Sequence, residues 1–155
     1  MTASEQIVRT VADAPWLPPG GRADVVRTGG GSCPEPTSLV RLLVARDDAV
    51  LCVPRDGTGK LDLPTTRVAT GESGWSAARR LAGDVLGTAR DLTVVGYVRN
   101  TVRPGPGYPD YPWPSPHAHF VVFRSGTADV RVPGAWVPLA APGDLVERHW
   151  WPLVG

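Results

Sequence analysis

The chain of 155 residues has few cysteines, no long hydrophobic run and almost no net charge. Its two cysteines, Cys33 and Cys52, lack the close spacing of a zinc-binding pair, and two thiols do not make a disulfide framework. Because Cys52 lies in the apolar segment 50–53, we expect it to be a buried thiol. The longest apolar runs, such as residues 121–123, are far too short to span a bilayer.

The net charge is +1, since 16 basic residues nearly balance 15 acidic ones. Such a chain lacks the strong surface charge that attracts nucleic acids or acidic membranes, so we expect neither as a partner. Apolar residues make up 42% of the chain, which excludes a disordered tail. Residues 1–16 contain acidic side chains and no apolar stretch of signal-peptide length, so we expect a cytoplasmic protein.

The length suits a single domain with its own core. Prolines and glycines cluster in segments 15–21, 29–36 and 104–116, which we expect to be loops. Regular patterning begins at Ser38. We therefore divide the chain into an N-terminal arm or extension, residues 1–37, and a domain, residues 38–155. Within the arm we expect a helical or irregular segment, then a short strand at 23–27.

The domain begins with alternating apolar patterns that predict strands. Residues 39–45 and 49–54 are β-prone, and the polar residues 46–48 between them predict a hairpin turn. We expect a turn at 56–59, and further strands at 61–63, 92–98, 118–123, 128–132 and 136–139. A last helix is expected at 141–147.

After Ser73 the apolar spacing changes to that of a helix. Apolar residues recur at i, i+3, i+4 and i+7, which predicts an amphipathic helix. They are Trp75, Ala78, Leu81, Ala82, Val85 and Leu86. Ser73 is the expected N-cap, and Gly87 is expected to end the helix.

Residues 61–87 read LDLPTTRVATGESGWSAARRLAGDVLG. Arg80 follows Glu72 after seven residues, and Gly87 lies seven positions further on. This spacing resembles the box of the Nudix (MutT-like) superfamily, G-x5-E-x7-R-E-U-x-E-E-x-G-U, in a degenerate form. The resemblance covers residues 38–154 and includes the Trp-containing final segment. It implies an α/β fold, the Nudix-like α/β/α sandwich with a mixed central sheet.

The resemblance also implies that most of a metal site is missing. The three helix carboxylates with which the family holds Mg²⁺ or Mn²⁺ fall on Leu81, Asp84 and Val85. Hard cations need several oxygen ligands, and Leu81 and Val85 lie one turn apart within the apolar stripe. Asp84 is therefore a weak metal ligand at best. We expect no cofactor, or Mg²⁺ or Mn²⁺ if hydrolytic activity is retained.

Glu72, Arg80 and Asp84 are the candidate catalytic residues. The resemblance implies an ion pair between Glu72 and Arg80 that ties the loop to the helix; a pair between Arg80 and Asp84 at i, i+4 is the alternative. Thr65 and Thr66 stand where the family has glycines. Their branched side chains resist positive φ, but their hydroxyls can donate to an anion, so both are candidate ligand-binding residues.

Two further features are candidate ligand-binding sites. His117 and His119 alternate along a predicted strand and therefore share one face. They form either an acid/base or metal-ligating pair, or a hydrogen-bonded pair at a strand entrance. The proline-rich loop carries Tyr111 and Trp113. These rings either stack on a purine, another aromatic metabolite or a peptide, or they cover the edge of the core.

Three functions remain open at this point. The leading hypothesis is a Nudix-fold domain that binds a nucleotide-like or other phosphorylated or aromatic small molecule, with standard diphosphate hydrolysis lost or weak. The second is a diverged enzyme. It is either a Nudix hydrolase that cleaves a nucleoside-diphosphate-linked substrate, or a metal-independent catalyst that uses His117 or His119. The third is an interaction module that binds a protein or forms a homodimer.

Overall fold

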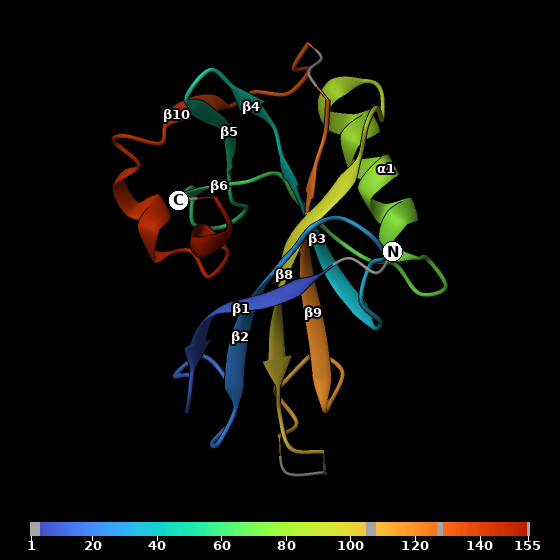
Figure 1. Ribbon diagram of the computed structural model, residues 1–155, viewed down its shortest axis with the longest axis vertical. Helices are drawn as coiled ribbons and strands as arrows, with labels where there is room; N and C mark the ends of the chain where they lie inside the picture. Colours follow the sequence, from blue (N-terminus) through green and yellow to red (C-terminus); the bar gives the residue numbers. More distant parts are fainter. Residues whose placement is uncertain (1–3, 105–107, 127–128, 155) are drawn as a thin grey trace.

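The computed structural model describes residues 4–104, 108–126 and 129–154. Its main sheet has six strands, and every neighbouring pair is antiparallel except β3 and β9, which run parallel. The sheet is therefore mixed, as expected (Figure 1). In spatial order the strands are β1 (Glu5–Val11), β2 (Arg22–Thr28), β8 (Thr93–Thr101), β9 (His117–Arg124), β3 (Thr37–Leu43) and β7 (Thr65–Arg67).

A second, smaller sheet forms where the chain leaves β3. It contains β4 (Ala45–Arg46), β5 (Ala49–Pro54), β10 (Ala135–Pro138) and β6 (Leu61–Asp62). The predicted hairpin is present as β4 and β5, and Asp47 adopts a φ of 53° in its turn. The first predicted strand is split, however, since β3 and β4 belong to different sheets. An apolar pattern does not reveal that division.

Helix α1 (Gly74–Leu86) confirms the predicted amphipathic helix and both of its ends. The Ser73 hydroxyl accepts a hydrogen bond from the Ser76 amide at 3.0 Å, and Gly87 ends the helix at a φ of 74°. The buried face of α1 packs on the main sheet, against Val40, Leu42 and Phe123. Its contributing residues are Ala77, Ala78, Leu81, Ala82, Val85 and Leu86.

The opposite face of the main sheet is covered by the small sheet and the C-terminal segment (Figure 1). The helix predicted at 141–147 is present in part, since residues 143–147 form a short 3-10 helix, η1 (Gly143–Glu147), rather than an α-helix. A second 3-10 helix, η2 (Trp151–Leu153), follows it. Gly143 has a φ of 59°, which a right-handed α-helix does not accept, so the helix cannot begin earlier. Trp150, Leu145 and Leu153 bury this segment in a second apolar cluster that also contains the buried Cys52.

The N-terminal segment contains strands where helical or irregular structure was expected. β1 replaces that segment, and β2 extends the strand predicted at 23–27 by one residue at each end. β1 was missed because it is an edge strand whose residues are mostly exposed, so its apolar alternation is faint. Residues 5–28 thus add two strands to the main sheet. The boundary at residue 37 stays a prediction.

Two further predictions fall partly outside the described residues. The first is the proline-rich loop at 104–116, of which residues 105–107 lie outside the described residues. The second is the strand at 128–132: Ala128 lies outside, and the described residues 129–132 form no strand. Across the described part of the chain, no helix has the length and hydropathy needed to cross a membrane.

Candidate functional site

Glu72 and Arg80 form the ion pair that the resemblance implies. Arg80 Nε donates to Glu72 Oε2 at 3.0 Å and Nη2 donates to Oε1 at 2.9 Å, a two-pronged contact. The Ala69 amide donates to the same Oε1 at 3.0 Å. These contacts, led by Arg80, lower the pKa of Glu72 to about 2. The pair therefore holds the loop before α1 against the helix.

Arg80 also connects the helix to β7. Its Nη1 donates to Thr66 Oγ1 at 3.0 Å, and its Nη2 donates to the Arg67 carbonyl at 2.9 Å. Thr65 Oγ1 donates to the Leu63 carbonyl at 2.7 Å. Both threonine hydroxyls that the sequence offers to a ligand are thus engaged within the protein. Within the described part of the chain, no ion pair joins Arg80 to Asp84, so the alternative i, i+4 pairing is absent.

The helix face that bears metal ligands in the family is apolar here. Leu81 and Val85 are 6% and 4% exposed and pack in the core against the sheet, whereas Asp84 is exposed. Both Glu72 oxygens are already taken by Arg80 and the Ala69 amide. Among the described residues, no three His, Cys, Asp or Glu side chains lie together in a way that could hold an ion. These residues do not fit Mg²⁺ or Mn²⁺, which needs several oxygen ligands.

His119 is buried and fully hydrogen-bonded. Arg99 Nε donates to its Nε2 at 3.0 Å, so the proton is on Nδ1, which lies 2.9 Å from the Pro36 carbonyl. Burial lowers the pKa of His119, with the Pro36 hydrogen bond opposing and the Arg99 charge assisting. A neutral ring with both nitrogens occupied is poorly suited to acid/base chemistry. These contacts favour the structural alternative.

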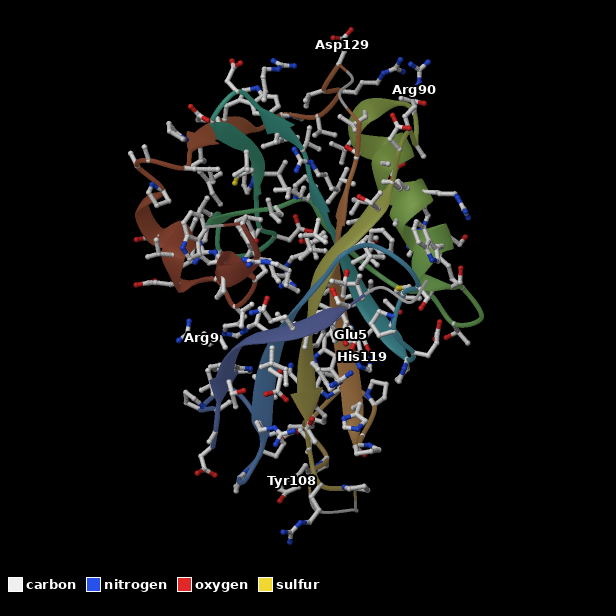
Figure 2. All side chains as sticks on the ribbon, viewed as in Figure 1. Glu5, Arg9, Arg90, Tyr108, His119 and Asp129 are labelled. Atoms are coloured by element: carbon white, nitrogen blue, oxygen red, sulfur yellow. The ribbon has the colours of Figure 1, made fainter. Side chains whose placement is uncertain are left out.

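His117 and His119 lie on the same face of β9, as expected, because alternate residues of a strand share a face. Figure 2 labels His119. Their ring centroids are 6.2 Å apart, and His117 is exposed, with Nδ1 3.2 Å from Thr101 Oγ1. Ala118, which lies between them, and Phe120, which follows His119, point to the opposite face, toward the small sheet. The histidines therefore lie across the sheet from the two cavities described next.

A cavity of about 600 Å³ lies between the main sheet and the segment from β5 to β7, and we call it the basic cavity. Three arginines line it, Arg41, Arg55 and Arg67, with Asp56, Asp62, Thr65 and Thr66 among the other residues. The register of β3 with β7 places Arg41 opposite Thr65 and Leu39 opposite Arg67. Antiparallel pairing thus brings residues distant in sequence to one wall.

Asp62 has no hydrogen-bonding capacity left for a ligand's donors. It is 3% exposed, and its Oδ2 accepts from Arg55 Nε at 2.8 Å and Nη2 at 2.6 Å. Its Oδ1 accepts from the Leu63 amide and from Trp150 Nε1, both at 2.8 Å. Arg55 therefore balances the negative charge of Asp62. The positive charges of Arg41 and Arg67, the other two arginines of the basic cavity, are not balanced by Asp62.

Arg41 is the exceptional residue of the basic cavity. Its Nε is buried and has no hydrogen-bond partner among the described residues. Burial lowers the pKa of Arg41, an effect that the Asp62 charge opposes. A buried donor on a cation is costly unless an acceptor, best an anion, satisfies it. In the sequence, the signal for this site is an arginine flanked by Val40 and Leu42 in an apolar strand.

The second cavity, of about 390 Å³, is the aromatic cavity. Trp16, Tyr108, Tyr111 and Trp113 line it together with Asn100 of β8. The two predicted aromatic ligand-binding residues, Tyr111 and Trp113, are thus brought together, whereas Thr65 and Thr66 line the basic cavity. Arg67 connects the two, because its guanidinium lies 4.8 Å from the centre of the Trp113 ring.

The sequence matches no protein-family model and no curated protein sequence. Solved structures resemble the fold. A crystal structure of the Bacillus subtilis pyrophosphohydrolase BsRppH, a mutant form, aligns with a TM-score of 0.53 at 11% identity, over 81% of this chain and 70% of that chain. A MutT protein from Methanosarcina mazei Go1 gives 0.47 at 22% identity, over 70% and 82%. A structure described as an ADP compounds hydrolase gives 0.47 at 18%, over 94% and 84%.

Identities this low concern the fold alone. The BsRppH alignment, together with the mixed sheets and the single α-helix of the described residues, gives the class of the fold. The protein has the α/β fold of the Nudix hydrolases.

Proposed function

We propose that the protein binds a phosphorylated small molecule, such as a nucleotide, in the basic cavity, and that metal-dependent diphosphate hydrolysis is lost or weak. The observation that carries the proposal is the Arg41 guanidinium, whose buried Nε has no partner among the described residues. It lies in a cavity that Arg55 and Arg67 also line. The proposed partner is a small molecule; cytoplasmic location and a homodimer stay predictions.

The charge of the basic cavity supports an anionic ligand. Three arginines face two aspartates, and one of these, Asp62, is already paired with Arg55. A guanidinium presents a planar fork of donors that matches two phosphate oxygens at once. A hydrogen bond to a charged group contributes about 1.5–3 kcal/mol. Arg41 and Arg67 together can therefore hold one phosphate firmly.

The helix side of the site supports the loss of hydrolysis. Nudix chemistry needs carboxylates on the helix, but Leu81 and Val85 are core residues here and Asp84 is exposed. Both carboxylate oxygens of Glu72 accept hydrogen bonds from Arg80, so the pair has a structural role. Arg41 and Arg67 are therefore available to a ligand, because Asp62 is paired with Arg55. Near α1, in contrast, Glu72 is engaged by Arg80, and Asp84 alone offers too few oxygens for a metal ion.

The test measures phosphate binding without metal. We expect inorganic diphosphate and nucleoside monophosphates to raise the melting temperature of the protein in the presence of EDTA. Replacing Arg41 by Gln removes the buried charge and is expected to weaken binding at least about tenfold, roughly 1.4 kcal/mol, measured by titration calorimetry. Arg79→Gln, at an exposed position of α1, is the matched control and is expected to bind as the wild type does.

Hydrolysis is tested separately. The wild-type protein is incubated with nucleoside diphosphate derivatives and Mg²⁺ or Mn²⁺. Turnover is expected to be slow or absent. Robust metal-dependent turnover that Asp84→Ala abolishes would contradict the loss of hydrolysis, and unchanged diphosphate affinity in a folded Arg41→Gln variant would contradict the binding site.

A further inference from the structure

We propose that the aromatic cavity binds a flat heteroaromatic ring that carries an N–H donor, and that Asn100 Oδ1 selects for that donor. This inference goes beyond the proposed phosphate binding. It rests on a different cavity and on different residues, and it does not require that an anion binds to the arginines.

Two buried polar atoms without partners carry the inference. Asn100 is 4% exposed, and its Oδ1 has no hydrogen-bond partner anywhere in the described ranges. The hydroxyl of Tyr111 is likewise buried and unpartnered there. Nearly all buried polar groups in folded proteins are hydrogen-bonded. Two such atoms in residues that line one cavity indicate that the cavity is built to receive a ligand with a polar edge.

The walls of the aromatic cavity suit a flat ring. Trp16, Tyr108 and Trp113 provide aromatic surface, and Figure 2 shows Tyr108 at the end of the molecule, below β8 and β9. A volume of about 390 Å³ lies in the range of small-molecule sites and exceeds the needs of a fused two-ring system. Aromatic side chains stack on such rings with offset or edge-on geometry. The ligand is therefore expected to be planar.

Contacts behind the walls hold the cavity in shape. The Trp113 ring meets Phe120 edge-on at 5.1 Å, and Arg67 lies on it at 4.8 Å. Trp16 stacks on His149 with ring centroids 3.9 Å apart. The wall residues are therefore positioned without a ligand, which reduces the ordering that binding requires.

The two polar atoms determine what the ring must offer. An amide oxygen can only accept, so the ligand must donate a hydrogen bond to Asn100 Oδ1. The Tyr111 hydroxyl can donate to a ring nitrogen or carbonyl of the same ligand. Purine-like and benzimidazole-like rings carry such a donor and acceptor on their edges. A ring of the same shape without the N–H leaves Asn100 Oδ1 unpaired, so its affinity for the cavity is lower.

The experiment compares benzimidazole with benzoxazole, which has the same two fused rings but an oxygen in place of the N–H. Binding near neutral pH is followed in ¹H–¹⁵N NMR spectra through the indole N–H signals of Trp16 and Trp113, assigned with Trp→Phe variants. Benzimidazole is expected to bind at least about tenfold more tightly and to shift both signals. Equal affinities of the two probes, or no shift of either signal, would overturn the proposal.

Variants at the polar atoms sharpen the test. Asn100→Leu keeps the approximate volume and removes the acceptor, so the preference for benzimidazole is expected to disappear. Asn100→Asp keeps an acceptor and is expected to keep the preference. A preference that persists in folded Asn100→Leu would refute the role of Asn100; the wild-type comparison stands even where a variant does not fold. Because both probes are uncharged, failure here and failure of phosphate binding are separate outcomes.

Discussion

At the scale of single residues, Glu72 and Arg80 hold the loop before α1 in place, and the helix face where the Nudix resemblance would place metal ligands is apolar. Glu72 and Arg80 account for five hydrogen bonds that join the loop, α1 and β7. Leu81 and Val85, which the resemblance aligns with carboxylates, are core residues. The Glu72–Arg80 pair therefore acts as a structural connection and can be tested as such.

The Glu72–Arg80 pair makes stability depend on pH in acid. The pKa of Glu72 is about 2 in the folded protein and lies below its value in the unfolded chain. A lowered carboxyl pKa contributes stability that is present above the unfolded value, near 4.3, and is lost as pH falls toward about 2. Glu72→Gln is therefore expected to lower the melting temperature near neutral pH but to match the wild type near pH 2.

The measurement is the melting temperature of both proteins across this acid range. Glu147→Gln, at an exposed position of η1, serves as the control and is expected to follow the wild type throughout. A Glu72→Gln variant that melts together with the wild type at neutral pH would show that the ion pair contributes nothing to stability.

At the scale of elements, the sequence predicts α1 better than it predicts the N-terminal strands. The helix depends on signals that act within a few residues: the apolar spacing, the Ser73 cap and the Gly87 stop. Such local signals can be recognised in the sequence. β1 is an exposed edge strand stabilised by pairing with β2, and its own residues carry little pattern. β1 therefore forms only because β2 lies beside it, and this neighbour cannot be recognised from the residues of β1 alone.

Placing a carboxylate on the buried face of α1 tests how the helix packs. Leu81→Glu would place a carboxylate at a position that is 6% exposed within the apolar cluster. An unpaired buried charge costs about 3–5 kcal/mol, so we expect a loss of stability of that order in urea unfolding. Ser76→Glu, at an exposed position in the first turn of the same helix, is expected to change stability by less than about 0.5 kcal/mol.

The two outcomes of Leu81→Glu are distinct. A destabilised variant agrees with a helix whose face at Leu81 belongs to the core. A variant as stable as the wild type, with new affinity for Mg²⁺ in calorimetry, would mean that this face is accessible and that one substitution creates a metal site there.

At the scale of the whole molecule, Asp62 joins parts of the chain that are far apart in sequence. It accepts from Arg55 and from the indole of Trp150, 88 residues away, and so fixes the C-terminal segment to the small sheet. Arg148 adds to this link by donating to the Leu61 carbonyl at 2.8 Å. These contacts position one wall of the basic cavity.

Asp62→Ala is expected to destabilise the protein by about 3 kcal/mol, since it leaves the Trp150 and Arg55 donors without their acceptor. Denaturant unfolding measures the loss, and Trp fluorescence reports whether the C-terminal segment detaches. Asp56→Ala, at an exposed position in the lining of the same cavity, is the control and is expected to stay within about 0.5 kcal/mol of the wild type. Equal stability of the two variants would refute the structural role of Asp62.

The sequence by itself determined the helix with its caps and the hairpin turn. Both follow from residues within one short segment, where spacing translates directly into contact. The Glu72–Arg80 pair was implied by the Nudix resemblance, and the structure chose it over the pairing of Arg80 with Asp84. Only the tertiary structure decided that Arg41, Arg55 and Arg67 share the basic cavity and that Asn100 lines the aromatic cavity. It also decided that His117 and His119 lie on the face of the main sheet opposite these cavities. Those neighbours arise from strand order and register across the sheet, which depend on the packing of the whole chain.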